Sequence, residues 1–239
     1  MAAEDVDQAA RLVQNLTLRT YRQGRITTLQ GWHRWLNDRD GIEGNPRIAA
    51  DACVLAAVTG RPVEAERWAD AVDRWQHQDP ARPADPVTEA SAAEVRTILC
   101  RRGIEQMRAD ADEMARQYAA ANIVVPAAAY FQGIARVLSG DLDSGDAFFE
   151  GVISIGESGA PDVLAGALCQ RSLVAMARGH WDQAAALATD AAAVGRRAGI
   201  EDSYASPWSA PCKPASPCTT ETMRRRAGNS SLPSGCGRC

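Results

Sequence analysis

Four helix-like segments of this chain end in a glycine and are followed almost at once by a second helix-like segment. The junctions are VLAAVTG-RPVEAE, ILCRRG-IEQMRA, IARVLSG-DLDSGD and LVAMARG-HWDQAA, and their glycines are Gly60, Gly103, Gly140 and Gly179. Successive glycines are 43, 37 and 39 residues apart. Glycine permits the left-handed backbone conformation that ends many helices. A helix–turn–helix unit that recurs about every 40 residues predicts a stack of helical pairs.

Apolar residues recur at three- and four-residue spacing through residues 1–202, and no stretch there alternates as a strand would. We therefore predict an all-α fold, a TPR-like solenoid of helical pairs that forms a right-handed superhelix. A single pair cannot bury its apolar face alone, so stacked pairs share a continuous core. The alternative is a non-repeating helical bundle with glycine turns. The expected helices are 4–22, 25–38, 46–59, 62–77, 87–102, 104–120, 125–139, 142–157, 161–178 and 181–198.

Composition changes abruptly near residue 202, and this change divides the chain into two predicted regions. Residues 1–202 hold nearly all the Val, Leu, Ile and Phe and carry a net charge of −8, with 21 basic and 29 acidic residues. Residues 203–239 have five Pro, seven Ser and four Cys, no Val, Ile or Phe, and a net charge of +4. Such a segment buries too little apolar surface to offset its ordering entropy. We expect a helical-repeat domain at 1–202 and a disordered tail at 203–239.

The tail nevertheless contains four of the seven cysteines, at Cys212, Cys218, Cys236 and Cys239. Four thiolates can hold a zinc ion tetrahedrally. The surrounding sequence lacks the apolar positions around which a small zinc module packs. A zinc site in the tail is therefore the minor alternative to no metal site at all.

No motif in the chain predicts catalysis or a bound cofactor. Lys213 is the only lysine among 26 basic residues, so the phosphate-binding sequence GxxxxGK[ST] is absent. His33, His77 and His180 have neither HExxH nor HxxxH spacing, and we expect His33 to face solvent beside core tryptophans. His180 is also expected to be exposed. We conclude that the protein is not an enzyme and needs no cofactor.

Two further groups of residues could either take part in chemistry or have a purely structural role. Cys100 precedes Arg101 and Arg102, so cations could activate its thiolate; we favour a thiol that faces the core, as for Cys53 and Cys169. Acidic pairs such as Glu64 and Glu66 or Asp70 and Asp73 could perform acid–base chemistry. We favour a solvated helix face on which Arg67 and Arg74 pair with these carboxylates.

The remaining candidates concern binding. Four tryptophans are candidate contacts for a ligand if they are exposed, and core residues otherwise. They are Trp32, Trp35, Trp68 and Trp75. No apolar run approaches the roughly 20 residues that span a bilayer, and the acidic, amphipathic N-terminus does not read as a signal peptide. The expected location is the cytoplasm, with no membrane contact. Because residues 1–202 are acidic, direct contact with nucleic acid is not expected.

Several stretches together resemble a known family. The stretches are YRQGRITTLQGWHRWL at 21–36, NPRIAADACVLAAVTGRPVEAERWADAVDR at 45–74 and the long run from GIARVLSGD to GHWDQAAALA. They are similar to the C-terminal helical region of large ATP-binding LuxR-type transcriptional regulators, the maltose-regulator-like group. The resemblance covers about residues 10–202. It implies the TPR-like part of a regulator whose other parts are a nucleotide-binding switch and a DNA-binding helix-turn-helix. Neither the ATP motif nor the helix-turn-helix has a counterpart in this sequence.

The likeness stops near Tyr204, where alanine- and leucine-rich helices would continue in the family. A sudden rise of Pro, Ser, Cys and Arg is typical of GC-rich DNA read out of frame, so we expect a truncated regulator. Its helical module would bind a protein segment or a small effector, and an uncapped end of the stack could form a homodimer. The alternatives are a stand-alone interaction scaffold with a zinc-binding tail and a remnant without function.

Overall fold

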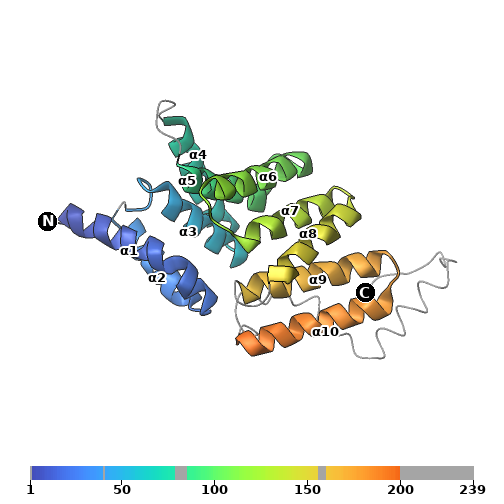
Figure 1. The fold of residues 1–239 in the computed structure, drawn as a ribbon. Helices are drawn as coiled ribbons and strands as arrows, with labels where there is room; N and C mark the ends of the chain where they lie inside the picture. Colours follow the sequence, from blue (N-terminus) through green and yellow to red (C-terminus); the bar gives the residue numbers. More distant parts are fainter. Residues whose placement is uncertain (1, 40, 79–84, 156–159, 200–239) are drawn as a thin grey trace, which may run out of the picture.

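The computed structural model describes residues 2–39, 41–78, 85–155 and 160–199, and ten α-helices account for most of them. They are α1 (Ala2–Arg22), α2 (Ile26–Asn37), α3 (Pro46–Val58), α4 (Pro62–Gln78), α5 (Pro86–Leu99), α6 (Ile104–Ala120), α7 (Pro126–Leu138), α8 (Leu142–Ile155), α9 (Pro161–Ala177) and α10 (Trp181–Ala198). Figure 1 shows them following an arc that starts with α1 and α2 and returns towards them with α9 and α10.

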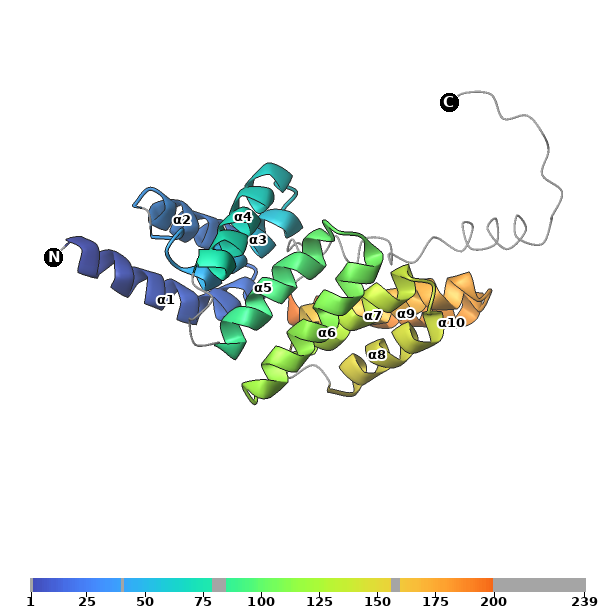
Figure 2. The same ribbon diagram turned by 90° about the horizontal axis from the view of Figure 1, so that it is seen from above.

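Consecutive helices pack as antiparallel pairs, as the sequence predicts, and this is clear in both ribbon views (Figures 1 and 2). The four junction glycines all have positive φ, at 71°, 86°, 88° and 78° for Gly60, Gly103, Gly140 and Gly179. Positive φ is readily adopted only by residues without a side chain, which explains why glycine stands there. The arrangement is consistent with a helical repeat. The right-handed superhelix stays a prediction.

Most helix boundaries lie within two residues of the expected ones, and the end of α5 differs by three. The helix expected at 87–102 ends at Leu99, because Cys100 takes the left-handed conformation, with φ 48° and ψ 36°. The arginines expected in the last helical turn, Arg101 and Arg102, therefore lie in the turn between α5 and α6. The expected helix 142–157 is helical to Ile155, and its last two residues lie outside the described part of the chain.

Proline and side-chain caps account for where several helices begin. Five helices start with proline, which fits the first turn because its missing N–H has no partner there in any case. The side chain of Asn45 accepts a hydrogen bond from the backbone N–H of Ile48 at the start of α3. Asp85 caps α5 in the same way, accepting from the N–H groups of Val87 and Thr88. These caps satisfy donors that a helix leaves unpaired at its N-terminus.

The apolar core is divided along the arc. One buried cluster is formed by helices α1 to α5, and a second joins α6, α7, α8 and α9 around Phe149 and Met107. A third lies between α9 and α10. Phe149 is fully buried, and its ring faces Tyr130 at a centroid distance of 5.9 Å.

Helices α7 and α8 approach closely at Gly133. A Cβ atom placed on Gly133 would lie 2.5 Å from Cε1 of Phe149, nearer than two carbon atoms can pack. Only glycine therefore lets the Phe149 ring lie against the α7 backbone.

We expect Gly133→Ala to destabilise the protein by about 1–2 kcal/mol, because overpacking against a buried ring outweighs the gain in helix propensity. Gly151→Ala is the matched control, since a Cβ on Gly151 of α8 meets nothing within 4 Å. That control should be stabilised, by up to about 1 kcal/mol. Urea unfolding of both variants measures the two effects. Equal changes of the same sign would contradict the packing described here.

Candidate functional site

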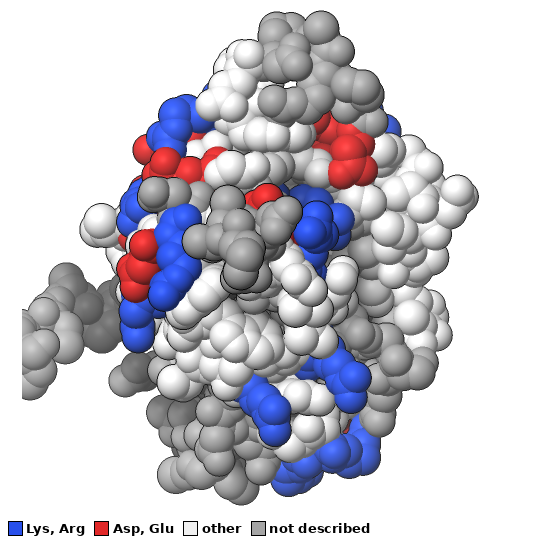
Figure 3. Space-filling view, turned by 90° about the vertical axis from the view of Figure 1, so that its left-hand side faces the viewer, with Lys and Arg blue, Asp and Glu red and all other residues white. Residues whose placement is uncertain are grey.

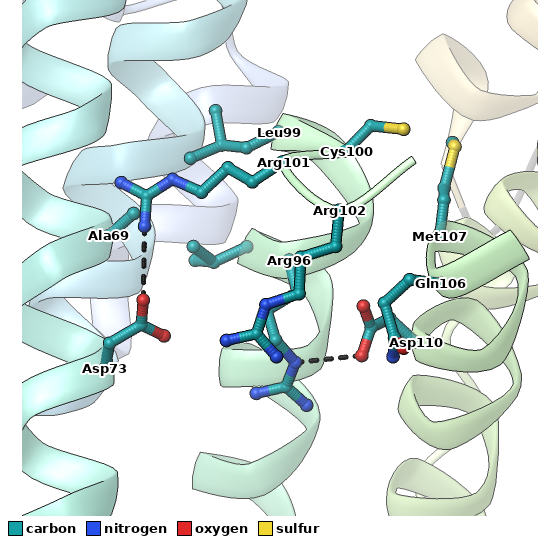
Figure 4. A pocket seen from close by; sticks show the side chains of 11 residues that line it. Ala69, Asp73, Arg96, Leu99, Cys100, Arg101, Arg102, Gln106, Met107 and Asp110 are labelled. Carbon is teal, nitrogen blue, oxygen red and sulfur yellow. Dashed lines mark hydrogen bonds and ion pairs between the residues drawn. The ribbon is translucent and has the colours of Figure 1, made fainter. Parts of the chain in front are cut away.

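A small pocket lies between α4, α5 and α6, and Figure 4 shows its side chains. Arg96 donates from Nε to the Asp110 carboxylate at 2.9 Å and from Nη1 to Gln76 at 2.9 Å. Asp110 is nearly buried, with 8% of its side chain exposed. The lining residues are Ala69, Asp73, Val95, Arg96, Leu99, Cys100, Arg101, Arg102, Gln106, Met107 and Asp110.

Arg101 is bound to α4 through three carboxylates. Its guanidinium donates to Glu66 at 2.7 Å, to Asp70 at 2.9 Å and to Asp73 at 3.1 Å. The expectation that Arg67 and Arg74 pair with the acidic residues of α4 is wrong for these three carboxylates. Arg67 instead binds Asn37 and lies 3.8 Å from Glu43. The i, i+4, i+7 spacing of the acids presents them on one face of α4, where the next helical pair meets it.

The thiol of Cys100 does not face these cations. In Figure 4 the Cys100 side chain points towards Met107, whereas Arg101 runs in the opposite direction. Cys100 packs against the apolar cluster around Phe149, which supports the structural reading of this residue. It is half-buried, however, whereas Cys53 and Cys169 are buried as expected. The Arg96 and Arg101 guanidiniums are already bound to carboxylates, whereas Arg102, which also lines the pocket, forms no ion pair with the described residues.

A second group of polar residues comes from five helices. We call it the inner cluster: Tyr21 of α1, Asp51 of α3, Glu94 of α5, Tyr118 of α6 and Asp162 of α9. All five are half-buried. The carboxylates of Asp162 and Glu94 both raise the pKa of Tyr21, so α1 and α9 come within electrostatic reach of each other. Figure 1 shows α1 and α9 towards the two ends of the arc.

Asp51 and Glu94 are the unusual members of the inner cluster. Burial raises the pKa of Asp51 from 3.8 to about 7, against smaller lowering effects of Arg47 and Thr17. Burial, and then the Asp51 charge, raises the pKa of Glu94 from 4.5 to about 7, against a lowering contact with the Tyr118 hydroxyl. Within the described residues, neither carboxylate forms an ion pair. Two nearby carboxyls in such surroundings resist simultaneous ionisation.

The same surroundings raise the pKa values of the two tyrosines in the inner cluster. Burial, followed by the charges of Asp162 and Glu94, raises the pKa of Tyr21 to about 12. Burial also raises the pKa of Tyr118. Both phenols therefore stay neutral near pH 7 and present hydroxyl groups and aromatic rings beside the carboxyls. One carboxylate oxygen of Asp162, Oδ1, is buried and accepts no hydrogen bond from the described residues.

These shifts predict how stability depends on pH. Because the folded-state pKa values of Asp51 and Glu94 are raised, the native protein keeps protons between about pH 4 and 7 that the unfolded chain releases. Their contribution to stability is therefore present in acid and is lost as the pH rises through about 7. We expect the Asp51→Asn/Glu94→Gln variant to be about 1–2 kcal/mol more stable than wild type at pH 8, and no more stable at pH 4.

Urea unfolding of both proteins from pH 4 to pH 8 measures this difference. His33 titrates in the opposite sense, since burial and then Arg61 lower its pKa to about 4, but it is present in both proteins and cancels. A difference that is constant with pH would contradict the carboxyl pair.

The four tryptophans do not gather in one site. Trp35 is exposed, and the Arg39 guanidinium lies 4.2 Å from the centre of its ring. Trp68 is only 2% exposed, so it is a core residue and not a candidate ligand contact. Trp32 and Trp75 are half-buried, and Trp32 packs against core residues. The expectation that His33 faces solvent is wrong: it is 6% exposed and lies on the inward face of α2 with Leu29 and Leu36. His180 is exposed, as expected.

Other sequence-based expectations concern the surface and the tail. Cys212, Cys218, Cys236 and Cys239 lie outside the described residues. In the described part, no three His, Cys, Asp or Glu residues are placed to hold a metal ion. None of the described helices is long and apolar enough to cross a membrane. The face shown in Figure 3 carries both basic and acidic side chains, the acidic ones mostly in its upper half.

The exposed large apolar residues are spread along the described chain: three lie on α1, two in the turn between α6 and α7, and one on each of six other helices. On α1, Leu12, Leu16 and Leu18 are 55%, 40% and 58% exposed. Among described residues, α10 exposes no large apolar side chain, because its outer positions are mostly alanine and polar residues. Dimerisation through an uncapped end stays a prediction.

Sequence reasoning missed the inner cluster, although a signal for it exists. Asp51 and Glu94 each stand inside a run of small and apolar residues, IAADACVLAA and ASAAEVRTIL. Such a run is compatible with a buried carboxylate but does not require one, since Asp190 stands in the similar run ALATDAAAV and is exposed. The sequence did not indicate that the two runs would face each other.

Comparison with known proteins adds no relative. No family model, no curated protein and no solved structure matches this chain.

Proposed function

We propose that this chain is the ligand-binding helical-repeat module of a LuxR-type transcriptional regulator, and that it binds a protein segment or a small effector on the inside of the arc. The proposal rests on two supports. One is the resemblance of residues 10–202 to the helical region of those regulators. The other is the chemistry of the inner cluster.

The inner cluster is the observation that carries the proposal. The cluster has five half-buried side chains from five helices, and two of them, Asp51 and Glu94, are carboxyls that have no ion-pair partner within the described residues. A fold selected for stability alone would fill such positions with apolar side chains, because half-buried carboxyls without a cationic partner destabilise it. Residues that cost stability are frequently kept for binding.

A thermal-shift screen tests this proposal. The full chain is screened at pH 7 against a panel of amino acids, amines, sugars and carboxylic acids, alongside the Asp51→Asn/Glu94→Gln variant and the exposed control Asp190→Asn. We expect at least one compound to raise the Tm of wild type and of the control by 2 °C or more, and to leave the inner-cluster variant unchanged. A panel without such a compound, or with hits that shift all three proteins equally, would overturn the proposal.

A further inference from the structure

We propose that the pocket between α4, α5 and α6 binds a carboxylate group carried on a short carbon chain, with Arg102 as its counter-ion and the apolar side chains of the pocket as the wall for the chain. No residue that lines this pocket belongs to the inner cluster, so it is a second site and the inference goes beyond the proposed function.

The cavity itself is small and partly apolar. Its volume is about 70 Å³. Ala69 of α4, Val95 of α5 and Met107 of α6 line it, and all three are buried. Close packing of three helices therefore holds the apolar part of the lining in place. Since a water molecule occupies about 30 Å³ in the liquid, the space suits a group of a few heavy atoms.

The charged side chains of the lining leave one cation without a partner. Arg96 is paired with Asp110 at 2.9 Å, and Arg101 is paired with Asp73 at 3.1 Å. Arg102 is the fifth charged residue of the lining, and it forms no ion pair with the described residues. A guanidinium keeps its charge in proteins. The lining therefore carries one uncompensated positive charge.

The other partners of Arg101 do not cancel that charge. Glu66 and Asp70 also bind the Arg101 guanidinium, but neither residue lines the pocket. The side chains of both are more than half exposed, so water and salt screen them from the cavity.

The direction of the Arg102 side chain supports an anion in the cavity. Figure 4 shows Arg102 extending in the same direction as Arg96, into the space between α4 and α6, while Arg101 runs the other way. A long cation without a partner ordinarily places its charged end in open water. Arg102 instead lines a cavity that already contains the Arg96 guanidinium, and an anion there would offset the repulsion between them.

The combination of one free guanidinium and an apolar wall favours a carboxylate over a phosphate. A guanidinium presents two parallel N–H groups that match the two oxygens of a carboxylate. Phosphate brings up to two charges and no apolar part, so it would desolvate Val95 and Met107 without covering them. The carboxylate could belong to a free short-chain acid or to the C-terminus of a protein segment.

An NMR titration of the full chain at pH 7 and constant ionic strength tests the proposal. The probes are acetate, propionate, butyrate and the peptide acetyl-Ala-Ala, and the comparison compounds are inorganic phosphate and 1-butanol. The Nε–H group of Arg102 and the methyl group of Met107 report binding, and Arg102→Met and Met107→Leu assign their signals. We expect saturable shifts of both signals with butyrate.

The series of acids tests the apolar wall. Each added CH₂ group should tighten binding by up to about fourfold, the equivalent of about 0.8 kcal/mol. Phosphate lacks the carbon chain and 1-butanol lacks the charge, so both should bind at least tenfold more weakly than butyrate. Tighter binding of butyrate than of the peptide would assign the site to a free acid, and the reverse to a protein C-terminus.

Arg102→Met should weaken butyrate binding at least tenfold, as reported by the Met107 methyl group. Arg102→Lys keeps the charge without the paired N–H groups and should fall between the two. Arg108→Met is the matched control, because Arg108 is an exposed arginine of α6 that does not line the pocket. It should bind butyrate as wild type does. Unchanged amide signals away from the pocket show that each variant is folded.

No saturable shift with butyrate, equal binding of phosphate and butyrate, or equal binding in Arg102→Met and wild type would overturn the proposal. The Asp51→Asn/Glu94→Gln variant should bind butyrate as wild type does, and loss of binding there would place the acid at the inner cluster instead. If butyrate binds through Arg102 while no compound in the thermal-shift screen depends on Asp51 and Glu94, this inference stands and the proposed function is wrong.

Discussion

Phe149→Ala is expected to destabilise the protein by about 3–5 kcal/mol, since it removes a fully buried aromatic ring from the centre of the α7–α8–α9 core. The ring lies against Gly133, where α7 has no side chain to fill the resulting space. Tyr130, the ring nearest to it, is itself held over Gly166 of α9. The cavity therefore cannot collapse easily, and the cost should fall in the upper part of that range.

Phe148→Ala is the matched control, because Phe148 is the neighbouring residue but is only half-buried, with the Arg136 guanidinium 4.8 Å from its ring centre. Its loss should cost about 1–2 kcal/mol. Urea denaturation of both variants gives the comparison. Similar losses for the two would show that Phe149 is not the centre of this core.

Arg96→Met is expected to cost about 2–4 kcal/mol, because it leaves the Asp110 carboxylate nearly buried without its partner. Arg96 also joins α4 to α5 through Gln76, so the contact between two helical pairs weakens at the same time. The double variant Arg96→Met/Asp110→Leu should recover most of the loss, since it removes the stranded charge.

Arg102→Met is the control for this experiment. Arg102 lines the same pocket but is exposed and makes no ion pair in the described part of the chain, so its replacement should change stability by less than about 0.5 kcal/mol. A loss with Arg102→Met equal to that with Arg96→Met, or no recovery in the double variant, would contradict the role given to the Arg96–Asp110 pair.

The helices were predictable because local signals agree with the tertiary structure. Three signals each act over a few residues: a proline at the start of a helix such as α3 or α4, an apolar stripe along it and a glycine at its end. Together they predict the helix boundaries to within a few positions. The exception is the end of α5, where Cys100 adopts a left-handed conformation that is uncommon for a residue with a side chain. The position of Gly103 alone suggested a longer helix.

The inner cluster could not be predicted in the same way. Tyr21 and Asp162 are far apart in the sequence, and their approach depends on how each helical pair is rotated against the next. That rotation depends on packing details between pairs, such as the contact of Tyr130 with Gly166 of α9 and the Arg101 bonds to α4. His33 shows the same limit on a smaller scale, since its neighbours Trp32 and Trp35 gave no sign that it faces the core.

The most direct test of the inner cluster is an NMR titration of the side-chain carboxyl carbons of Asp51 and Glu94 in the full chain. Asp51→Asn and Glu94→Gln assign the two signals. We predict midpoints near pH 7 for both, and a lower midpoint for Glu94 in Asp51→Asn, because the Asp51 charge helps to raise the pKa of Glu94. Midpoints below pH 5 for both carboxyls, with no response of either to loss of the other, would contradict the account.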